Sequence, residues 1–400
     1  MPHSVSDGKT ENNIKKIEHW EERIIETLSN VITSEIQHKQ EIILQLSGGL
    51  DSTALFLMIE KLLGKQQNFS LVHFLNEDIA TSNESLHVHT LVQDTDSELT
   101  FENWQYSLDC PSKLKWNRPN HCILGAKNKF SLFDNFKDLG QERLGIINGH
   151  GGDQLFISIA QPILLLDYFL DRGPKGLFQK LHELCVLNRS PAIPYGIDFF
   201  KLFCKYITKR KNMHFLSMPE PVVWFKQECQ NMINLQNFLP PFWDRLLTRK
   251  TSPGKMAQIM DTYHASATAI FDACQFNEVF PYLTQPMIEV GYEIPTFLTF
   301  NTEWSRLHFR RAISKHFRTD LVWRQSKGET SGMFQRFFRD EMEKIQEFCL
   351  EGFLAREKML VKDGLNQAIY RAASGQMNNM WPLINLISLE LFLMRVTNLK

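Results

Sequence analysis

The sequence predicts an α/β fold, in which a parallel twisted sheet flanked by helices is followed by a mostly helical C-terminal half. In the first 200 residues, short apolar runs alternate with segments of helical periodicity, and two runs end in glycine-rich turns with an aspartate. Strands separated by helices need crossover connections, which produce parallel pairing. Beyond about residue 200 the pattern is helical, with proline-rich breaks at 219–221, 240–241 and 281–286.

The first elements follow a polar segment over residues 1–16, which we expect to be a flexible tail. Apolar positions from Ile17 to Ile36 line one face of an amphipathic helix. The run EIILQL, from Glu41 to Leu46, predicts a strand. Helical spacing from Thr53 to Leu63 then predicts a helix, which ends at Gly64.

Three further apolar runs are interpreted as strands: Phe69–Leu75, Leu86–Val92 and Leu144–Ile147. The segment from Leu155 to Leu170 is strongly apolar and is interrupted by Pro162. Ligands of parallel sheets bind beyond the carboxyl ends of the strands. We therefore expect the glycine-rich turns, which follow two of the strands, to form the functional edge of the sheet.

The composition indicates a globular protein, because 43% of the 400 residues are hydrophobic and 22% are charged. The net charge of −1 offers no bulk attraction for nucleic acid or a membrane. Seven dispersed cysteines without a CxxC pair fit a reducing cytosol and argue against structural zinc. The N-terminus has no apolar signal core, and no uninterrupted apolar run approaches about 18 residues. We expect a cytoplasmic protein without a membrane-spanning helix.

The turn LQLSGGLDST links the first predicted strand to the helix after it. Gly48 and Gly49 allow the backbone to approach a ligand closely and expose their N–H groups. A helix start adds unpaired N–H donors and partial positive charge, and Ser47 and Ser52 add hydroxyls. These features are typical of a phosphate site, although no Gly-Lys-Ser/Thr of the lysine-bearing phosphate loop follows.

A second strand ends in a turn of the same kind, Asn148 to Gln154, which carries Asp153. Two glycine turns, each with an aspartate at a strand end, suit a nucleoside triphosphate and its metal. Asp51 and Asp153 offer oxygen ligands to Mg²⁺ and leave positions for phosphate and water. The structural alternative is a pair of ordinary turns whose aspartates cap helices.

Four ordered motifs resemble those of the asparagine synthetase-like N-type ATP pyrophosphatases. Residues 47–52, SGGLDS, match the SGGxDS pyrophosphatase loop, and residues 151–156, GGDQLF, are similar to the second motif of asparagine synthetases. Residues 309–312, FRRA, resemble the LRxA helix, and residues 324–328, RQSKG, resemble the RxxKG motif with the catalytic lysine. The resemblance covers about residues 20 to 335 and implies an adenine nucleotide α-hydrolase-like fold.

Within this superfamily the chain resembles the lasso-peptide cyclases. Residues 280–286, FPYLTQP, with Glu289 and residues 294–296, IPT, are similar to a stretch of these cyclases, as is Gln161-Pro162 followed by Asp167. Such enzymes adenylate a side-chain carboxylate of a leader-cleaved precursor peptide, and the peptide α-amine then closes a macrolactam. The resemblance implies a leader peptidase and a leader-recognition protein as partners in the pathway. It also implies an ATP-pyrophosphatase core over 17–200, completed over 201–400 by a helical region with the peptide cleft.

The resemblance implies ATP and Mg²⁺ as cofactors. The positions implied in nucleotide binding are Leu46, Ser47, Gly48, Gly49, Asp51, Ser52, Gly151, Gly152 and Asp153. Asp51 and Asp153 would hold the metal, and Lys327 would stabilise the oxyanion during amine attack. Arg306 stands at a position where these cyclases tend to have arginine. Glu278 is adjacent to the position at which asparagine synthetases have a glutamate. We assign both residues to catalysis.

The chain departs from the family at its N-terminus. Only 46 residues precede Ser47, and Pro2 stands where the glutaminase-like domain of relatives has its nucleophilic cysteine. We therefore expect no amine donor derived from glutamine. Two alternatives stay open: a small-molecule amide or β-lactam-type synthetase of the same superfamily, and a catalytically silent nucleotide-binding scaffold.

Overall fold

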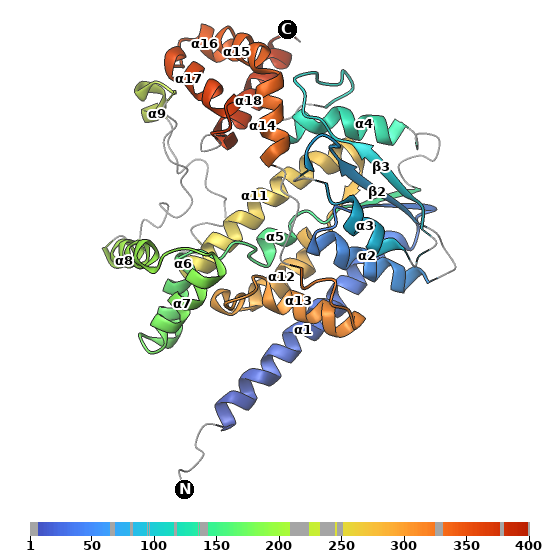
Figure 1. The fold of residues 1–400 in the computed structure, drawn as a ribbon, viewed down its shortest axis with the longest axis vertical. Coiled ribbons are helices and arrows are strands. Elements are labelled where there is room, and N and C mark those ends of the chain that lie inside the picture. The colour runs from blue at the N-terminus through green and yellow to red at the C-terminus, as the bar shows by residue number, and fades with distance from the viewer. Residues whose placement is uncertain are drawn as a thin grey trace.

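The computed structural model describes residues 7–64, 69–80, 83–93, 95, 97–115, 118–134, 136, 143–208, 224–232, 245, 251–324, 331–376 and 380–398. Within these ranges the chain forms an all-parallel sheet between helices and a helical C-terminal half (Figure 1). The predicted fold class is confirmed. The proline-rich breaks at 219–221 and 240–241 lie outside the described residues.

The sheet consists of β1 (Glu41–Gln45), β2 (Ser70–Leu75), β3 (Leu99–Asn103), β4 (Leu144–Ile147) and β5 (Glu278–Val279). Their order is β3-β2-β1-β4-β5, and all pairs are parallel. The chain runs from β1 outward to β3 and returns on the other side of β1 at β4. Leu44 lies opposite Ile147, so β1 and β4 end side by side. This reversal of direction creates a crevice for ligands at their carboxyl ends.

Three of the four predicted strands are confirmed, and the strand predicted over 86–92 is wrong. Ser85–Val92 forms helix α3, in which Val88 and Leu91 are buried while Leu86 is 82% exposed. Buried residues three positions apart are typical of a helix. A seven-residue run is too short to distinguish the helical period of about 3.6 residues from the strand period of about two. The third strand is β3, whose mixed sequence LTFEN gives a weak strand signal. Two-residue β5 was also missed.

The sheet is buried on both faces, as parallel sheets usually are. Alternate residues of a strand point to opposite faces, so Ile42 and Leu44 join one core cluster and Ile43 joins another. The larger cluster includes residues of α1 (Asp7–Ile36), α2 (Leu50–Leu63), α3, α12 (Gln285–Glu293) and α13 (Leu307–Phe317). The smaller cluster includes α4 (Ala126–Asp134).

Helix α1 begins at Asp7, so the tail expected over residues 1–16 is wrong for residues 7–16. The first turns of α1 project away from the body of the molecule (Figure 1). Helix α2 ends as predicted at Gly64, whose φ of 58° is a left-handed conformation that favours glycine.

The described parts of the segment between β4 and β5 are mainly helical. Its helices are α5 (Gly152–Leu155), α6 (Ile163–Arg172), α7 (Leu177–Leu187), α8 (Ala192–Thr208), α9 (Gln227–Met232) and α11 (Pro253–Phe276). Asp167 of α6 ties these elements together. It accepts hydrogen bonds from the Ser252 hydroxyl and the Gly254 N–H at 2.7 Å each, and from the Thr296 hydroxyl at 2.5 Å. The buried carboxylate therefore caps the start of α11.

The C-terminal helices form a second core. They are α14 (Ser331–Asp340), α15 (Met342–Leu350), α16 (Phe353–Arg356), α17 (Lys362–Ala373) and α18 (Met380–Asn398). Short 3₁₀ turns complete the fold at η2 (His121–Gly125), η6 (Pro281–Leu283) and η7 (Thr296–Leu298). Residues between 282 and 322 belong to the same core as β1. Part of the region after residue 200 therefore shares one core with the sheet.

By its length and composition alone, helix α18 could cross a membrane, although it contains no long uninterrupted apolar run. In the structure, Leu383 and Ile387 are fully buried in the C-terminal core. The Glu390 carboxylate accepts hydrogen bonds from the N–H groups of Phe353 and Leu354 at 2.8 Å each. These contacts are typical of a helix packed inside a protein.

Candidate nucleotide site at the strand ends

The carboxyl ends of β1 and β4 open into a cavity of about 250 Å³. Of the residues predicted to bind the nucleotide, the cavity is lined by Leu46, Ser47, Gly49, Asp51, Ser52 and Asp153. Val72 and Phe74 of β2 form an apolar part of its wall. The predicted residues Gly48, Gly151 and Gly152 shape the adjoining turns. The structure thus brings the two predicted glycine turns together around one cavity.

The first turn holds two serine hydroxyls at the start of α2. Ser47 Oγ lies 3.0 Å from Ser52 Oγ, which also accepts a 3.2 Å hydrogen bond from Ser47 N–H. The backbone at Gly48 has a φ of 76°, which glycine adopts without strain. The first turn of a helix leaves N–H groups without an intrahelical acceptor, and they attract anions. The local geometry therefore suits a phosphate.

The second turn packs so closely on the first that side chains are excluded. A Cβ atom added to Gly149 would lie 3.1 Å from Ser52 N, and one added to Gly152 would collide with Asp51 Oδ1. Glycine is needed at these positions so that the two turns can meet. His150 also lines the cavity, and burial lowers its pKa, so the ring is neutral at pH 7.

The predicted residues Asp51, Asp153 and Arg306 meet in one ion cluster. Arg306 Nη1 lies 2.9 and 2.8 Å from the two Asp51 oxygens and 2.8 Å from Asp153 Oδ1. Arg306 and Asp51 are buried. Burial opposes the charge on Arg306, but the Asp51 and Asp153 carboxylates outweigh it and raise the pKa of the guanidinium. Both aspartates therefore point at the same place.

Asp51 and Asp153 fit two ligand positions of a Mg²⁺ ion. Their oxygens already approach one nitrogen within 2.9 Å, so a single cation can contact both carboxylates. Mg²⁺ is commonly bound by one or two carboxylates together with phosphate oxygens and water. In the described part of the chain, no group of three or more His, Cys, Asp or Glu residues could hold a metal ion.

Glu278 lies behind the cavity instead of lining it. Lys129 Nζ contacts its two carboxylate oxygens at 3.0 and 2.9 Å and Asp272 Oδ2 at 3.2 Å, and all three side chains are buried. The side-chain amide of Gln45 connects this cluster to the cavity. It donates a hydrogen bond to Glu278 and accepts one from Asn148 Nδ2 at 2.9 Å. Within the described part of the chain, Gln45 links Glu278 to the site.

Sequence reasoning missed Gln45, Asn148 and Lys129. Gln45 is a polar residue at the end of an apolar strand, and this interruption was an available signal. Lys129 lies on α4, far from either turn in sequence, and no local pattern marks it. Tyr282 was also not assigned to the site, although its hydroxyl donates to the Asp51 carbonyl at 2.9 Å and fixes the start of α2.

Residues 325–330, which include the predicted catalytic Lys327, lie outside the described residues. The residue before them, Arg324, forms an ion pair with Glu84. Glu84 in turn lies against the first turn, because a Cβ atom added to Gly48 would be 3.5 Å from Glu84 Cβ. The chain therefore enters this segment close to the candidate site.

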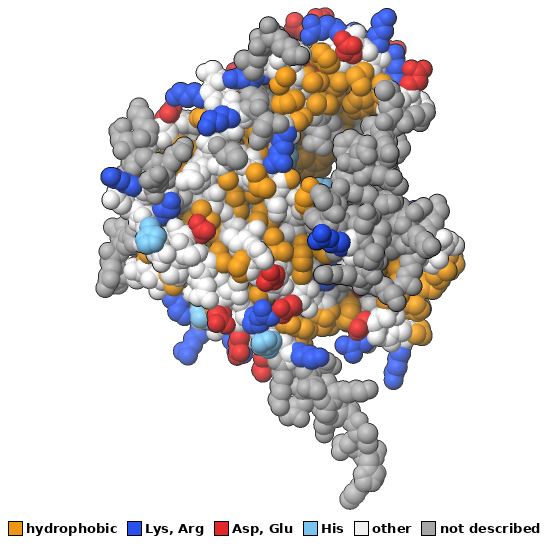
Figure 2. Space-filling view, turned by 180° about the vertical axis from the view of Figure 1, so that it is seen from behind, with side chains coloured by type: hydrophobic (Ala, Val, Ile, Leu, Met, Phe, Trp, Pro, Cys, Tyr) orange, Lys and Arg blue, Asp and Glu red, His pale blue; other side chains and the backbone are white. Residues whose placement is uncertain are grey.

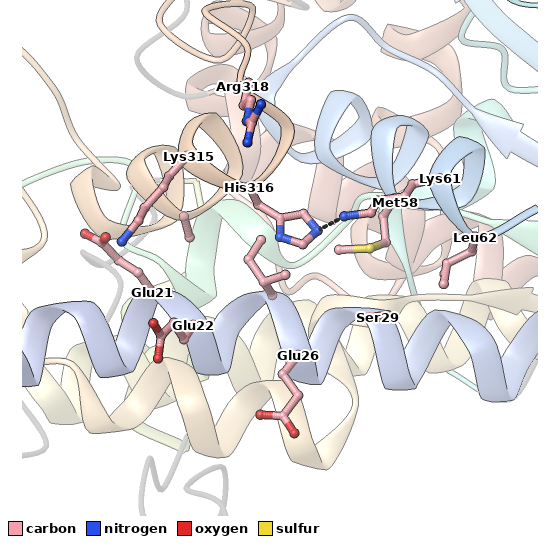
Figure 3. Close-up of a pocket in the computed structure, with 12 residues that line it drawn as sticks. Glu21, Glu22, Glu26, Ser29, Met58, Lys61, Leu62, Lys315, His316 and Arg318 are labelled. Carbon is pink, nitrogen blue, oxygen red and sulfur yellow. Dashed lines mark hydrogen bonds between the residues drawn. The ribbon is translucent and has the colours of Figure 1, made fainter. Parts of the chain in front are cut away.

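A larger cavity of about 760 Å³ lies between α1, α2 and α13 (Figure 3). Glu21 and Glu22 lie on α1, and Lys61 Nζ of α2 is 2.7 Å from His316 Nε2 of α13. None of the predicted site residues lines this cavity. Basic residues at the end of α13 are explained by the negative end of the helix dipole.

No model of a known protein family matches this chain. A comparison with curated proteins likewise gives no match.

Proposed function

We propose that this chain is an ATP-dependent ligase that forms an amide bond and releases AMP and pyrophosphate. The observation that carries the proposal is the convergence of Asp51 and Asp153 at the serine-bearing start of α2. The order of the motifs along the chain supports it, because they resemble those of the asparagine synthetase-like ATP pyrophosphatases.

The chemistry requires ATP because a carboxylate and an amine do not condense at neutral pH. Hydroxide is a poor leaving group, whereas AMP leaves readily from an acyl-adenylate. The substrate carboxylate attacks the α-phosphorus and expels pyrophosphate, and the amine then displaces AMP. Orientation of the amine near the adenylate contributes strongly, since effective molarities can reach about 10⁵ M or more.

Each part of the site has a role in this reaction. The Ser47–Ser52 turn holds the phosphates with its N–H groups and hydroxyls. Asp51 and Asp153 would hold Mg²⁺, which would supply positive charge to offset that of the pyrophosphate. Arg306, which lies between the two carboxylates, keeps them together when the metal is absent. Lys327 stabilises the oxyanion that forms when the amine attacks, and Glu278 positions the site through Gln45.

The substrate we propose is a leader-cleaved precursor peptide, cyclised to a lasso macrolactam in the cytoplasm. The peptide α-amine attacks an adenylated side-chain carboxylate, and a leader peptidase and a leader-recognition protein supply the peptide. Exposed apolar residues at helical spacing, Ile193, Ile197 and Phe200, make α8 a candidate wall for an apolar peptide. Apolar side chains are visible on the side of the molecule where α6 to α8 lie (Figure 2).

The first test is product analysis with ATP, Mg²⁺ and a linear core peptide from a neighbouring precursor gene. We expect AMP, pyrophosphate and a peptide lighter by one water. The release of ADP alone would contradict the proposal. A small-molecule synthetase would instead give AMP with small acids and amines but no cyclised peptide, and a silent scaffold would give no pyrophosphate exchange with any substrate.

The same assay tests the assignment of Lys327. We expect Lys327→Ala to lower the rate of ring closure by about 10²–10³-fold, the usual cost of losing an oxyanion-stabilising group. Nucleotide binding should be largely retained. Lys362→Ala, at an exposed position at the start of α17, is the matched control and should cyclise at the normal rate. Full activity of Lys327→Ala would remove this residue from the mechanism.

A further inference from the structure

Arg310, one turn after Arg306 on α13, is a buried cation that contacts no carboxylate in the described part of the chain. It is 8% exposed. Its guanidinium donates to the carbonyls of Ser305 and Val322, and it lies 5.0 Å from the ring centre of Trp304. Such neutral partners offset a buried charge only in part. Burial and the nearby Arg306 lower the pKa of Arg310 to about 10, as expected for a poorly compensated cation.

Arg310 lines a cavity of about 500 Å³. Arg189, after the end of α7, and Arg324 line the same cavity, and Thr302 adds a hydroxyl. Among the described lining residues, Glu303 is the one carboxylate. Three arginines from separate segments thus meet at one opening. Arg324 is paired with Glu84, so Arg189 and Arg310 supply the positive charge of the opening.

This cavity adjoins the candidate nucleotide site. Arg310 follows Arg306 by one helical turn, and Asp51 and Asp153 are close enough to influence its charge. Arg324 immediately precedes the segment that carries Lys327. The cavity therefore lies beside the region where a triphosphate would be cleaved.

We propose that this arginine-lined cavity binds the pyrophosphate released in the reaction, with Arg310 as its buried donor. That the pyrophosphate comes from the ligase reaction depends on the proposed function, whereas the binding of pyrophosphate to this cavity does not. Planar guanidinium groups match pairs of phosphate oxygens, and their charge-assisted hydrogen bonds are strong. A multiply charged phosphate also balances several arginines better than a single carboxylate does. Pyrophosphate held here is separated from the adenylate, which disfavours the reverse reaction.

The test is a calorimetric titration of the full chain with inorganic pyrophosphate, without nucleotide or Mg²⁺. We expect Arg310→Met to weaken binding by about 10-fold or more and the exposed Arg189→Gln by about 3-fold, because each loses charge-assisted hydrogen bonds. Arg336→Gln, on α14 away from this cavity, is the matched control and should bind normally. Pyrophosphate should also change the tryptophan fluorescence, and Trp304→Phe should lose this signal.

The outcomes separate this inference from the proposed function. If Arg310→Met does not fold, Arg189→Gln and Trp304→Phe still decide the result. Normal affinity in the arginine variants, with loss of binding in Ser52→Ala, would place pyrophosphate at the first turn and overturn the inference while the ligase proposal stands. Absence of pyrophosphate binding at millimolar concentration would also overturn it. Arginine-dependent binding in a chain that forms no AMP would support the inference and reject the proposed function.

Discussion

Replacing Arg306 with methionine is expected to lower the free energy of unfolding by about 3–5 kcal/mol when divalent cations are absent. The substitution keeps most of the side-chain volume but removes the charge between Asp51 and Asp153. The buried Asp51 carboxylate then faces Asp153 with no cation between them. Urea unfolding in the presence of EDTA, followed by circular dichroism, measures the change.

Addition of Mg²⁺ should restore stability to Arg306→Met by more than it stabilises the wild-type chain. The reason is that a bound metal ion would take the place that Arg306 holds between the two carboxylates. The control is Arg336→Gln, which breaks solvent-accessible ion pairs and should leave the stability nearly unchanged. An equal response to Mg²⁺ in variant and wild type would contradict the assignment of Asp51 and Asp153 as metal ligands.

Replacing Lys129 with methionine should have a comparable effect and lower the free energy of unfolding by about 3–5 kcal/mol at pH 7. Lys129 is the cation that contacts both Glu278 and Asp272 in a buried cluster. These carboxylates raise the pKa of Lys129 against the opposing effect of burial, so the lysine is charged at all relevant pH values. Without it, two buried carboxylates are left uncompensated behind the nucleotide cavity.

The loss of stability caused by Lys129→Met should become smaller as the pH falls from 7 toward 5. Burial already raises the pKa of Glu278 when Lys129 is present, and removal of the cation raises it further. The folded state then binds a proton at a pH where the unfolded carboxylate is ionised, so stability decreases as pH rises. Lys127→Met, two residues earlier and exposed on α4, is the control. A pH-independent difference between Lys129→Met and the wild type would show that Glu278 remains ionised.

The functional edge of the sheet was predictable because its signals are local. The run from Glu41 to Leu46 has a continuous apolar centre at residues 42–44, and a glycine turn with a helix start follows it directly. Repetition of this pattern at Leu144–Ile147 placed Asp51 and Asp153 at the ends of parallel strands. Parallel pairing of neighbouring strands then brings them together, and the structure confirms this.

The parts that were missed depend on contacts between distant segments. Lys129 meets Glu278 across 149 residues, and no spacing rule connects an α4 lysine to a two-residue strand. The segment over 86–92 is helical because Val88 and Leu91 pack on the larger core, and this tertiary packing overrides the β propensity of its valines and threonine. The cluster of Arg189, Arg310 and Arg324 likewise forms only after folding.

Nucleotide binding at the two turns is tested most directly by a calorimetric titration of the full chain with a non-hydrolysable ATP analogue, with and without Mg²⁺. We expect a single site whose affinity falls by about 10-fold or more when Mg²⁺ is removed, and by a similar factor in Asp51→Asn and Asp153→Asn. Absence of binding, or an affinity that is indifferent to Mg²⁺ and to both substitutions, would contradict it.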